Sequence, residues 1–390
     1  MMIRLGISLY PEQESMEEIE QYLALASKYG FTQLFTSLFS VPGEPKEVIM
    51  YFENLCTVAN KYHFNVAIDV HTATLEAYGA SYDNLKVFKD IGIDTVRMDL
   101  SFGDHRDITL VENEFGLKIQ FNAFMADLLE ENMRKVKDKS KVIMCYNFYP
   151  QRYTGTSVSQ MKQVNQVWRH AQIRLAAFIT SLSKEAHGPW PVKDGLPTLE
   201  KHRDLAVGKQ IRELIALGIE DIYFGNAFAK ESELKEASDV IQAMNDEKIV
   251  VDEKSLAAFK EVLPNLGNRK IMLELTSVAH ELTDIEKVIV YGFDKHVDLG
   301  DSNEYMLRSR VTRTYYGKKG IPFRKYDKEF FDAGDVVVVN DNLKHYAGEL
   351  QIVRSEMKNN GQRNYVGKLS EFDQQLSTLI EPGDYFFFKE

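Results

Sequence analysis

The sequence has few of the residues that build disulfide bonds and metal sites. Its 390 residues include two cysteines, Cys56 and Cys145, each alone within an apolar segment and neither part of a CxxC motif. A disulfide framework is therefore excluded, and isolated core thiols of this kind are typical of cytoplasmic proteins. The histidines show no HxH or HExxH spacing, so we expect no metal and no other cofactor. The absence of a GxSxG motif argues against a serine hydrolase.

Long apolar runs and excess positive charge are also missing. No apolar run approaches the length of about 18 residues that a membrane-spanning helix needs. The apolar stretch that opens the chain is too short for a signal peptide, so we expect a cytoplasmic protein with no membrane partner. The formal net charge of −11 repels nucleic acid. A small molecule is the expected partner, and a homo-oligomer remains open.

The first two thirds of the chain repeat a strand followed by an amphipathic helix. The predicted strands cover residues 4–10, 33–39, 65–71, 95–100, 117–123, 142–149, 174–181 and 221–227. Helical patterns separate them, the first of which opens with the capping box formed by Ser15 and Glu18. Eight such units in roughly 245 residues predict a (β/α)8 TIM-like barrel. A doubly wound sheet is the alternative, but no glycine-rich fingerprint follows the first strand.

The pattern changes after about residue 246. A short helical piece is expected at 253–263, and a second capping box is formed by Thr283 and Glu286. From about residue 306 the chain reads as short β segments separated by turn residues. We therefore predict a catalytic barrel over 1–246 and a smaller, mostly antiparallel β domain over 247–390.

Two strands near the middle of the barrel each carry an aspartate close to the carboxyl end. Asp69 lies in "NVAIDVH" and Asp99 in "TVRMDL", and in both strands apolar residues alternate with polar ones. Because the side of a barrel strand that faces the helices must be apolar, we expect the polar faces to point inward and Asp69 and Asp99 to reach the mouth. A hydrogen-bonded polar interior of structural value only is the alternative.

A third carboxylate, Glu200 in "GLPTLEKHR", follows the seventh strand. Paired carboxylates at a barrel mouth can divide general-acid and nucleophile or base roles, as glycoside hydrolysis requires. The pattern is not decisive, because Asp99 could equally form a salt bridge with Arg97 two residues away.

Cations lie on the loops after strands six and seven. Arg152 belongs to "NFYPQRYTG", and His202 and Arg203 belong to "GLPTLEKHR". Arginine suits bidentate binding of phosphate or carboxylate, and phosphate sites near the last strands are common in barrels. In the β domain, Arg308 and Arg310 alternate along a predicted strand, which could present them to the barrel mouth or to solvent.

Several motifs together resemble the bacterial 6-phospho-N-acetylmuramidases. They are, in order, "RLGISLYPE", "GFTQLFTSL", "IDV", "RMD", "NFYPQRYTG", "GLPTLEKHR", "YFGNA", "LRSR", "YAGELQIV" and "NYVGKL". The resemblance covers essentially the whole chain and implies a TIM-like barrel followed by a cyclophilin-like β domain. It also implies hydrolysis of N-acetylmuramic acid 6-phosphate linked to N-acetylglucosamine during cytoplasmic cell-wall recycling. The cyclophilin-like label concerns the fold and not prolyl isomerase chemistry.

With this resemblance we assign candidate roles. Glu200 is expected to be the general acid and Asp99 the nucleophile or base, with Asp69 orienting Asp99 or exchanging roles with it. The predicted substrate-binding residues are Arg97, Asn122, Asn147, Tyr149, Arg152, His202, Arg203, Arg308 and Arg310. Three positions depart from the family pattern, namely Asn226 in place of an aspartate, Gln151-Arg152 in place of Arg-Pro, and Gly300 in place of an arginine.

Two other function classes remain open on the sequence alone. One is a phosphosugar-binding sensor built on a degenerate barrel, which Asn226 would favour. The other is a phosphosugar lyase or isomerase, for which Lys118 on the inward face of strand five is the lysine suited to a Schiff base.

Overall fold

The structure is a computed structural model that describes residues 2–11, 13–38, 43–72, 75–191, 193–246, 260–261, 263 and 265–390. These residues form two compact units, Met2–Val240 and Ile241–Glu390, which we describe separately. The helical piece expected at 253–263 lies largely outside the described residues.

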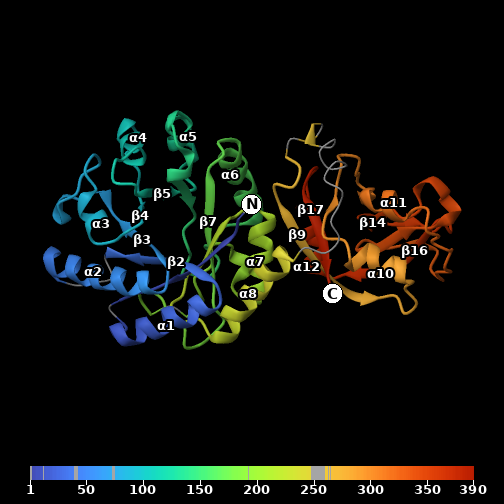
Figure 1. Ribbon diagram of the computed structural model, residues 1–390, viewed down its shortest axis with the longest axis horizontal. Coiled ribbons are helices and arrows are strands. Elements are labelled where there is room, and N and C mark those ends of the chain that lie inside the picture. The colour runs from blue at the N-terminus through green and yellow to red at the C-terminus, as the bar shows by residue number, and fades with distance from the viewer. Residues whose placement is uncertain are drawn as a thin grey trace. The chain divides into compact units, whose positions relative to one another are not determined.

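The first unit contains a closed barrel of parallel strands (Figure 1). In sheet order they are β1 (Arg4–Ser8), β2 (Phe31–Ser37), β3 (Asn65–Val70), β4 (Thr95–Met98), β5 (Lys118–Asn122), β6 (Val142–Cys145), β7 (Arg174–Ile179) and β8 (Asp221–Phe224). Strand β8 pairs with β1 through the partners Arg4 and Asp221, which closes the ring. The predicted (β/α)8 barrel is therefore confirmed, and the doubly wound alternative is wrong because the sheet has no open edge.

Helices follow the strands on the outside of the barrel (Figure 1). They are α1 (Met16–Lys28), α2 (Pro45–Lys61), α3 (Lys86–Asp90), α4 (His105–Val111), α5 (Ala126–Lys135), α6 (Val158–His170), α7 (Val207–Ala216) and α8 (Glu231–Asn245), with short 3-10 turns η3 (Glu76–Tyr78), η4 (Lys139–Lys141) and η5 (Glu200–His202). Helix α1 shows how the pattern works: Ile19, Leu23 and Ala26 are fully buried on one face. The predicted capping box starts it, since Ser15 and Glu18 bond each other's backbone N–H.

The barrel interior has a charged layer at its amino-terminal end. Asp221 is fully buried there and accepts hydrogen bonds from Arg4 at 2.7 Å and 2.5 Å and from Arg174 Nε at 2.9 Å. Above this layer the ring of Tyr223 lies so close to Gly6 that a Cβ at that position would be 2.3 Å from it. Glycine is therefore required at this position.

The middle of the interior is aromatic and only partly polar. The rings of Phe35 on β2 and Phe178 on β7 lie 5.2 Å apart, although these strands are not neighbours, so the two side chains meet across the barrel. Tyr223 on β8 packs against Phe178 at 5.6 Å. The expectation of a polar inward face holds for Arg97 and Gln120, which are buried on β4 and β5. On β2, β7 and β8, where no polar face was predicted, Phe35, Phe178 and Tyr223 supply the apolar filling that a packed barrel needs, although β8 also carries Asp221 of the charged layer.

The second unit is built on a seven-stranded sheet with the order β10-β17-β9-β16-β13-β14-β11. The bounds are β9 (Lys270–Val278), β10 (His296–Val297), β11 (Met306–Ser309), β13 (Asp335–Val339), β14 (Leu350–Val353), β16 (Arg363–Leu369) and β17 (Tyr385–Lys389), and β12 (Phe330–Phe331) with β15 (Met357–Lys358) forms a separate pair. All pairings in the seven-stranded sheet are antiparallel except that of β9 with β17. The predicted mostly antiparallel β domain is therefore confirmed.

Helices of the second unit connect these strands. They are α10 (Asp284–Tyr291), α11 (Val311–Tyr316) and α12 (Glu371–Ser377), with the 3-10 segment η6 (Asp341–Tyr346). The predicted capping box of Thr283 and Glu286 starts α10.

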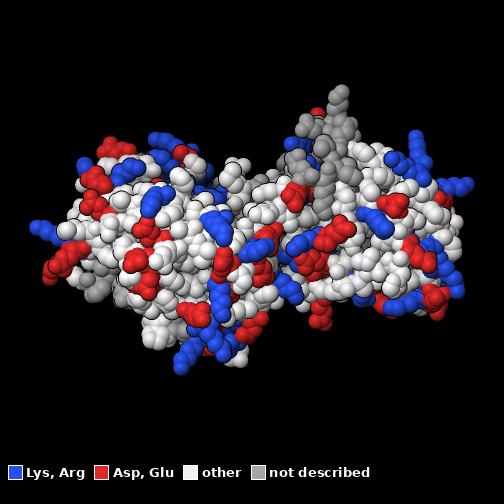
Figure 2. Space-filling view, turned by 60° about the horizontal axis from the view of Figure 1, so that its bottom comes forward, with Lys and Arg blue, Asp and Glu red and all other residues white. Residues whose placement is uncertain are grey.

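Charged side chains of both signs are interspersed over the face shown in Figure 2. None of the helices in the described ranges combines the length and the apolar character needed to cross a bilayer.

The buried charged layer yields a stability prediction. Asp221→Asn removes the carboxylate that Arg4 and Arg174 share, and we expect it to lower the free energy of unfolding by about 3–5 kcal/mol, as when one partner of a buried ion pair is lost. Asp90→Asn is the matched control, because its partner Lys86 is 65% exposed. Both tryptophans lie in the barrel unit, so urea unfolding followed by their fluorescence measures the effect. Equal stability of the two variants would contradict the assigned role.

Candidate active site

A cavity of about 600 Å³ opens at the carboxyl ends of the barrel strands. Its volume is within the range of small-molecule sites and its position is that of barrel active sites. The lining residues come from β2, β3, β4 and β7 and from the loops beyond β1, β4, β6 and β7. They are Tyr10, Phe35, Ser37, Asp69, Arg97, Asp99, Asn147, Phe148, Pro150, Phe178, Pro189 and Trp190.

Arg97 is at the centre of the polar wall. Strand register places it directly beside Asp69 on the neighbouring strand, and Asp99 follows two residues later on the same face. One terminal nitrogen of its guanidinium donates to Asp69, and the other donates to Asn147 Oδ1 and, at 3.4 Å, to Asp99. Both interpretations from the sequence therefore hold: Asp69 and Asp99 line the mouth of the barrel, and Asp99 also forms a salt bridge with Arg97. Arg97 joins the two aspartates instead of neutralising only one.

The two aspartates experience different surroundings. The side chain of Asp69 is 19% exposed, and that of Asp99 is 43% exposed. Burial raises the pKa of Asp69 above its ordinary value, while the charge of Arg97 acts in the opposite direction. Unequal environments of this kind let one carboxyl group hold a proton while its neighbour stays ionised.

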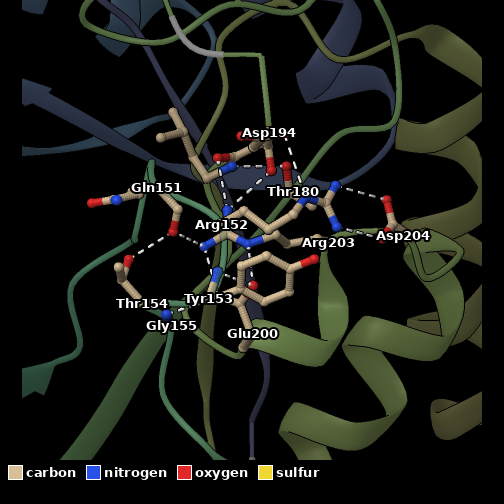
Figure 3. A network of polar contacts seen from close by, with 12 residues as sticks. Gln151, Arg152, Tyr153, Thr154, Gly155, Thr180, Asp194, Glu200, Arg203 and Asp204 are labelled. Carbon is tan, nitrogen blue, oxygen red and sulfur yellow. Dashed lines mark hydrogen bonds and ion pairs between the residues drawn. The ribbon is translucent and has the colours of Figure 1, made fainter.

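Glu200 is in a different network, shown in Figure 3. Its carboxylate accepts from Arg203 at 2.6 Å and 2.8 Å and from the backbone N–H groups of Tyr153 at 2.7 Å and Gly155 at 2.8 Å. The hydrogen bond from Arg203 lowers the pKa of Glu200 to about 2, and the two backbone donors add to the effect. Glu200 is also not among the residues that line the cavity.

These contacts favour a structural role for Glu200 over the general-acid role expected from the sequence. A general acid must hold a proton at the working pH, whereas every contact of Glu200 stabilises the ionised form. The carboxylate instead joins the loop after β6 to η5, and the buried Arg203 extends the link by donating to Gln151 O at 2.7 Å and Asp194 O at 3.0 Å (Figure 3). Glu200 therefore fits a structural role at the rim.

The other predicted cations on these loops are also not in the cavity wall. Arg152 is 34% exposed and pairs with Asp204 at 2.8 Å and Asp194 at 3.4 Å (Figure 3). His202 is fully buried and bonds Glu213 at 2.9 Å, and burial lowers its pKa. The sequence grouped Arg152, His202 and Arg203 with the aspartates, and none of the three is among the residues that line the cavity with Asp69 and Asp99.

Three further amides and a tyrosine were singled out from the sequence. Asn147 lines the cavity, as described above. Asn122 caps its own turn by accepting from Phe124 N at 3.0 Å, and Tyr149 is held through its backbone N–H, which donates to Pro197 O at 3.0 Å. Asn226 accepts from Thr180 Oγ1 at 2.8 Å and Ser181 N at 3.1 Å, which are contacts that an aspartate could also accept.

Lys118 does not reach the mouth. It is the first residue of β5, at the amino-terminal end of the barrel, where its pKa is lowered by burial and by the charges of Arg4 and Arg174. Barrel chemistry takes place at the opposite end, so the geometry gives no support to a Schiff-base role.

Arg308 and Arg310 lie in the second unit. Arg308 binds the fully buried Glu349 through two hydrogen bonds of 2.7 Å and 3.0 Å, and Arg308 and Arg310 both pair with Asp301, at 3.1 Å and 3.0 Å. Their expected contact with substrate stays a prediction.

The sequence missed the aromatic wall of the cavity. Phe178 lies on a strand that is mostly apolar on both faces, and Phe35 lies on a strand whose two faces each mix polar and apolar residues. Alternation therefore could not show which residues point inward. Tyr10, Phe148 and Trp190 follow strands and belong to no periodic pattern. The one available signal was that Tyr10 and Phe148 stand at the carboxyl ends of predicted strands, where barrel sites are built.

Comparisons with known proteins cover the whole chain. Residues 5–239 match the family model described as 6-phospho-N-acetylmuramidase, N-terminal, and residues 273–389 match the one described as 6-phospho-N-acetylmuramidase, C-terminal. A crystal structure of an uncharacterized B. cereus protein is 31% identical with a TM-score of 0.76, and the match covers 100% of both chains. A conserved Enterococcus faecalis protein of unknown function is 20% identical with a TM-score of 0.55, covering 99% of this chain and 96% of that one. No curated protein sequence gives a significant match.

The role of Glu200 can be tested through the pH dependence of stability. Because the folded-state pKa of about 2 lies below the ordinary 4.5, the stabilisation is present above pH 4.5 and is lost as the pH falls from there towards 2. We expect the Tm of the wild type to fall more steeply between pH 5 and about pH 3 than that of Glu200→Gln. Glu185→Gln, in an exposed part of the same loop, is the control. Parallel curves for wild type and Glu200→Gln would refute the structural role.

Proposed function

The chain belongs to the 6-phospho-N-acetylmuramidase family, which makes it a glycoside hydrolase, and on that premise we propose that the barrel cavity cleaves N-acetylmuramic acid 6-phosphate from N-acetylglucosamine. The observation that carries the proposal is the pair Asp69 and Asp99, held by one buried arginine at the mouth. The pair offers the two carboxyl groups that glycoside hydrolysis uses.

The unequal environments favour Asp69 as the general acid. Burial raises the pKa of its carboxyl group, which favours the protonated form that a general acid needs. In this role Asp69 transfers its proton to the glycosidic oxygen as the bond from that oxygen to the anomeric carbon breaks. Asp99, more exposed and facing the same cavity, then either attacks the anomeric carbon or takes a proton from the attacking water. This assignment moves the acid role from Glu200 to Asp69.

Arg97 supports both steps. With Asp69 protonated, the positive charge of Arg97 balances the negative charge of Asp99, so the trio is neutral and an anionic substrate is not repelled. After the proton has left, the contact from Arg97 stabilises the new carboxylate of Asp69. Asn147 accepts from the same nitrogen that reaches Asp99 and so fixes the plane of the guanidinium.

The phosphate of the substrate needs a cation beyond this trio. Among the described residues that line the cavity, Arg97 is the one cation, and it is already engaged by carboxylates. Arg152 is the candidate we retain, because it is half-exposed on the loop that carries Asn147 and Pro150, and its partners Asp194 and Asp204 are themselves exposed. Such exposed ion pairs contribute little stability and can exchange for a phosphate.

The setting we propose is the cytoplasm, in the recycling of cell-wall fragments. Both thiols, Cys56 and Cys145, are buried and free, which is compatible with a reducing compartment.

The carboxylate assignment predicts a specific pattern of loss. We expect Asp69→Asn and Asp99→Asn each to lower kcat on the phosphorylated disaccharide by about 10²–10⁴-fold, the usual contribution of a positioned acid or base. Asp104→Asn is the matched control, because Asp104 caps α4 close to Asp99 in sequence but does not line the cavity, and asparagine caps equally well. Product release followed by mass spectrometry measures the rates. Near wild-type turnover by either cavity variant would exclude that residue.

A change of leaving group separates the two roles. A nitrophenol leaves without protonation, so Asp69→Asn should retain most of its activity on the nitrophenyl glycoside of N-acetylmuramic acid 6-phosphate while losing it on the disaccharide. Asp99→Asn should be slow on both substrates. The reverse pattern would exchange the roles of the two aspartates.

A further inference from the structure

The cavity has two unlike walls, and the function proposed above uses only one of them. Asp69, Arg97, Asp99 and Asn147, joined by the Arg97 guanidinium, form the polar wall. The aromatic lining residues form what we call the aromatic wall, in which Phe35, Phe148 and Phe178 pack ring against ring; its members are Tyr10, Phe35, Phe148, Phe178 and Trp190. A pyranose ring has a matching asymmetry, because its hydroxyl groups point outward around the ring and its C–H bonds are exposed on the faces. Aromatic rings attract such C–H faces through the negative charge above the ring plane.

Trp190 differs from the other members of the aromatic wall. Its side chain is 50% exposed, whereas Tyr10, Phe35 and Phe178 are buried. The second tryptophan of the chain, Trp168, is fully buried and donates its indole N–H to Ala123 O at 2.8 Å. An exposed indole at the edge of a cavity offers a large aromatic face that a bound ligand can cover.

The segment that carries Trp190 is fixed before any ligand binds. His187 forms two backbone hydrogen bonds with Ala227, of 2.8 Å and 3.2 Å, and Gln13 donates to Gly188 O at 2.6 Å. The ring of His187 bonds Glu14, whose side chain is only 4% exposed, and stacks on Phe228 at 5.7 Å and 20°. The loops after β1, β7 and β8 thus contact one another at His187, which precedes Trp190 by three residues.

We propose that Trp190 is a sugar-stacking platform, on which one pyranose ring of the substrate lies, and that His187 positions this platform through its contacts with Glu14 and Phe228. The proposal rests on the proposed function, because it assumes that the polar wall faces the scissile bond of the same substrate. In this proposal the aromatic wall binds one face of a sugar ring. The His187–Glu14 contact contributes to substrate affinity and takes no part in the chemical step.

The first test separates binding from catalysis. Trp190→Ala should raise KM for the phosphorylated disaccharide by about tenfold or more, the usual effect of truncating an aromatic contact residue, with kcat changed little. Trp190→Phe should recover part of the loss because it keeps an aromatic face. Tyr153→Ala is the control, since Tyr153 is 85% exposed on a neighbouring loop but does not line the cavity. An unchanged KM in Trp190→Ala would overturn the proposal and leave the proposed hydrolysis standing.

The second test needs no turnover. The difference between the fluorescence of wild type and of Trp190→Phe isolates Trp190, because both proteins contain Trp168. Adding N-acetylglucosamine or N-acetylmuramic acid 6-phosphate should change this difference signal saturably and protect it from quenching by acrylamide.

His187→Ala should make Trp190 more accessible to acrylamide without ligand, whereas His187→Gln, which can still donate to Glu14, should not. No response of Trp190 to either sugar would refute the platform, even if the wild type hydrolyses the disaccharide. A response without any hydrolysis would instead overturn the proposed function.

Discussion

The guanidinium of Arg97 is the interaction on which the polar wall depends. It is buried between strands, so it must be paired, and it is paired with Asp69, Asp99 and Asn147, which come from three different strand ends. Because a planar guanidinium has donors fixed in one plane, it sets the orientation of all three partners at once. Without it, two carboxylates would line the same cavity with no cation between them, which would disfavour the ionisation of both.

Two other polar contacts hold the loops around this trio. The Glu200–Arg203 network fixes the loop after β6 against η5, and the His187–Glu14 contact fixes the first part of the long segment between β7 and η5. Both use a buried or half-buried ion pair reinforced by backbone hydrogen bonds. The cavity is therefore bounded by segments whose positions are set in the free protein, which reduces the ordering cost of binding a flexible disaccharide.

The sequence predicted the parts of the fold that follow from periodicity. The strand and helix rhythm led to the barrel, and the alternation around Asp69 and Asp99 placed both aspartates at the mouth, where they line the cavity. Glu200 could not be assigned from its motif, because its partners include the backbone N–H groups of Tyr153 and Gly155, which depend on the path of a distant loop. Trp190 could not be found either, since a single aromatic residue in a loop has no pattern to read.

The central claim is that burial in the cavity wall raises the pKa of Asp69 above that of an ordinary aspartate. The direct measurement is a pH titration of the protein labelled with 13C at aspartate carboxyl groups, with the Asp69 signal assigned by its absence in Asp69→Asn. The account predicts that Asp69 titrates above the ordinary aspartate value of about 3.9. A signal that titrates at or below that value would show that Asp69 is an ionised partner of Arg97 and would leave the cavity without its proposed acid.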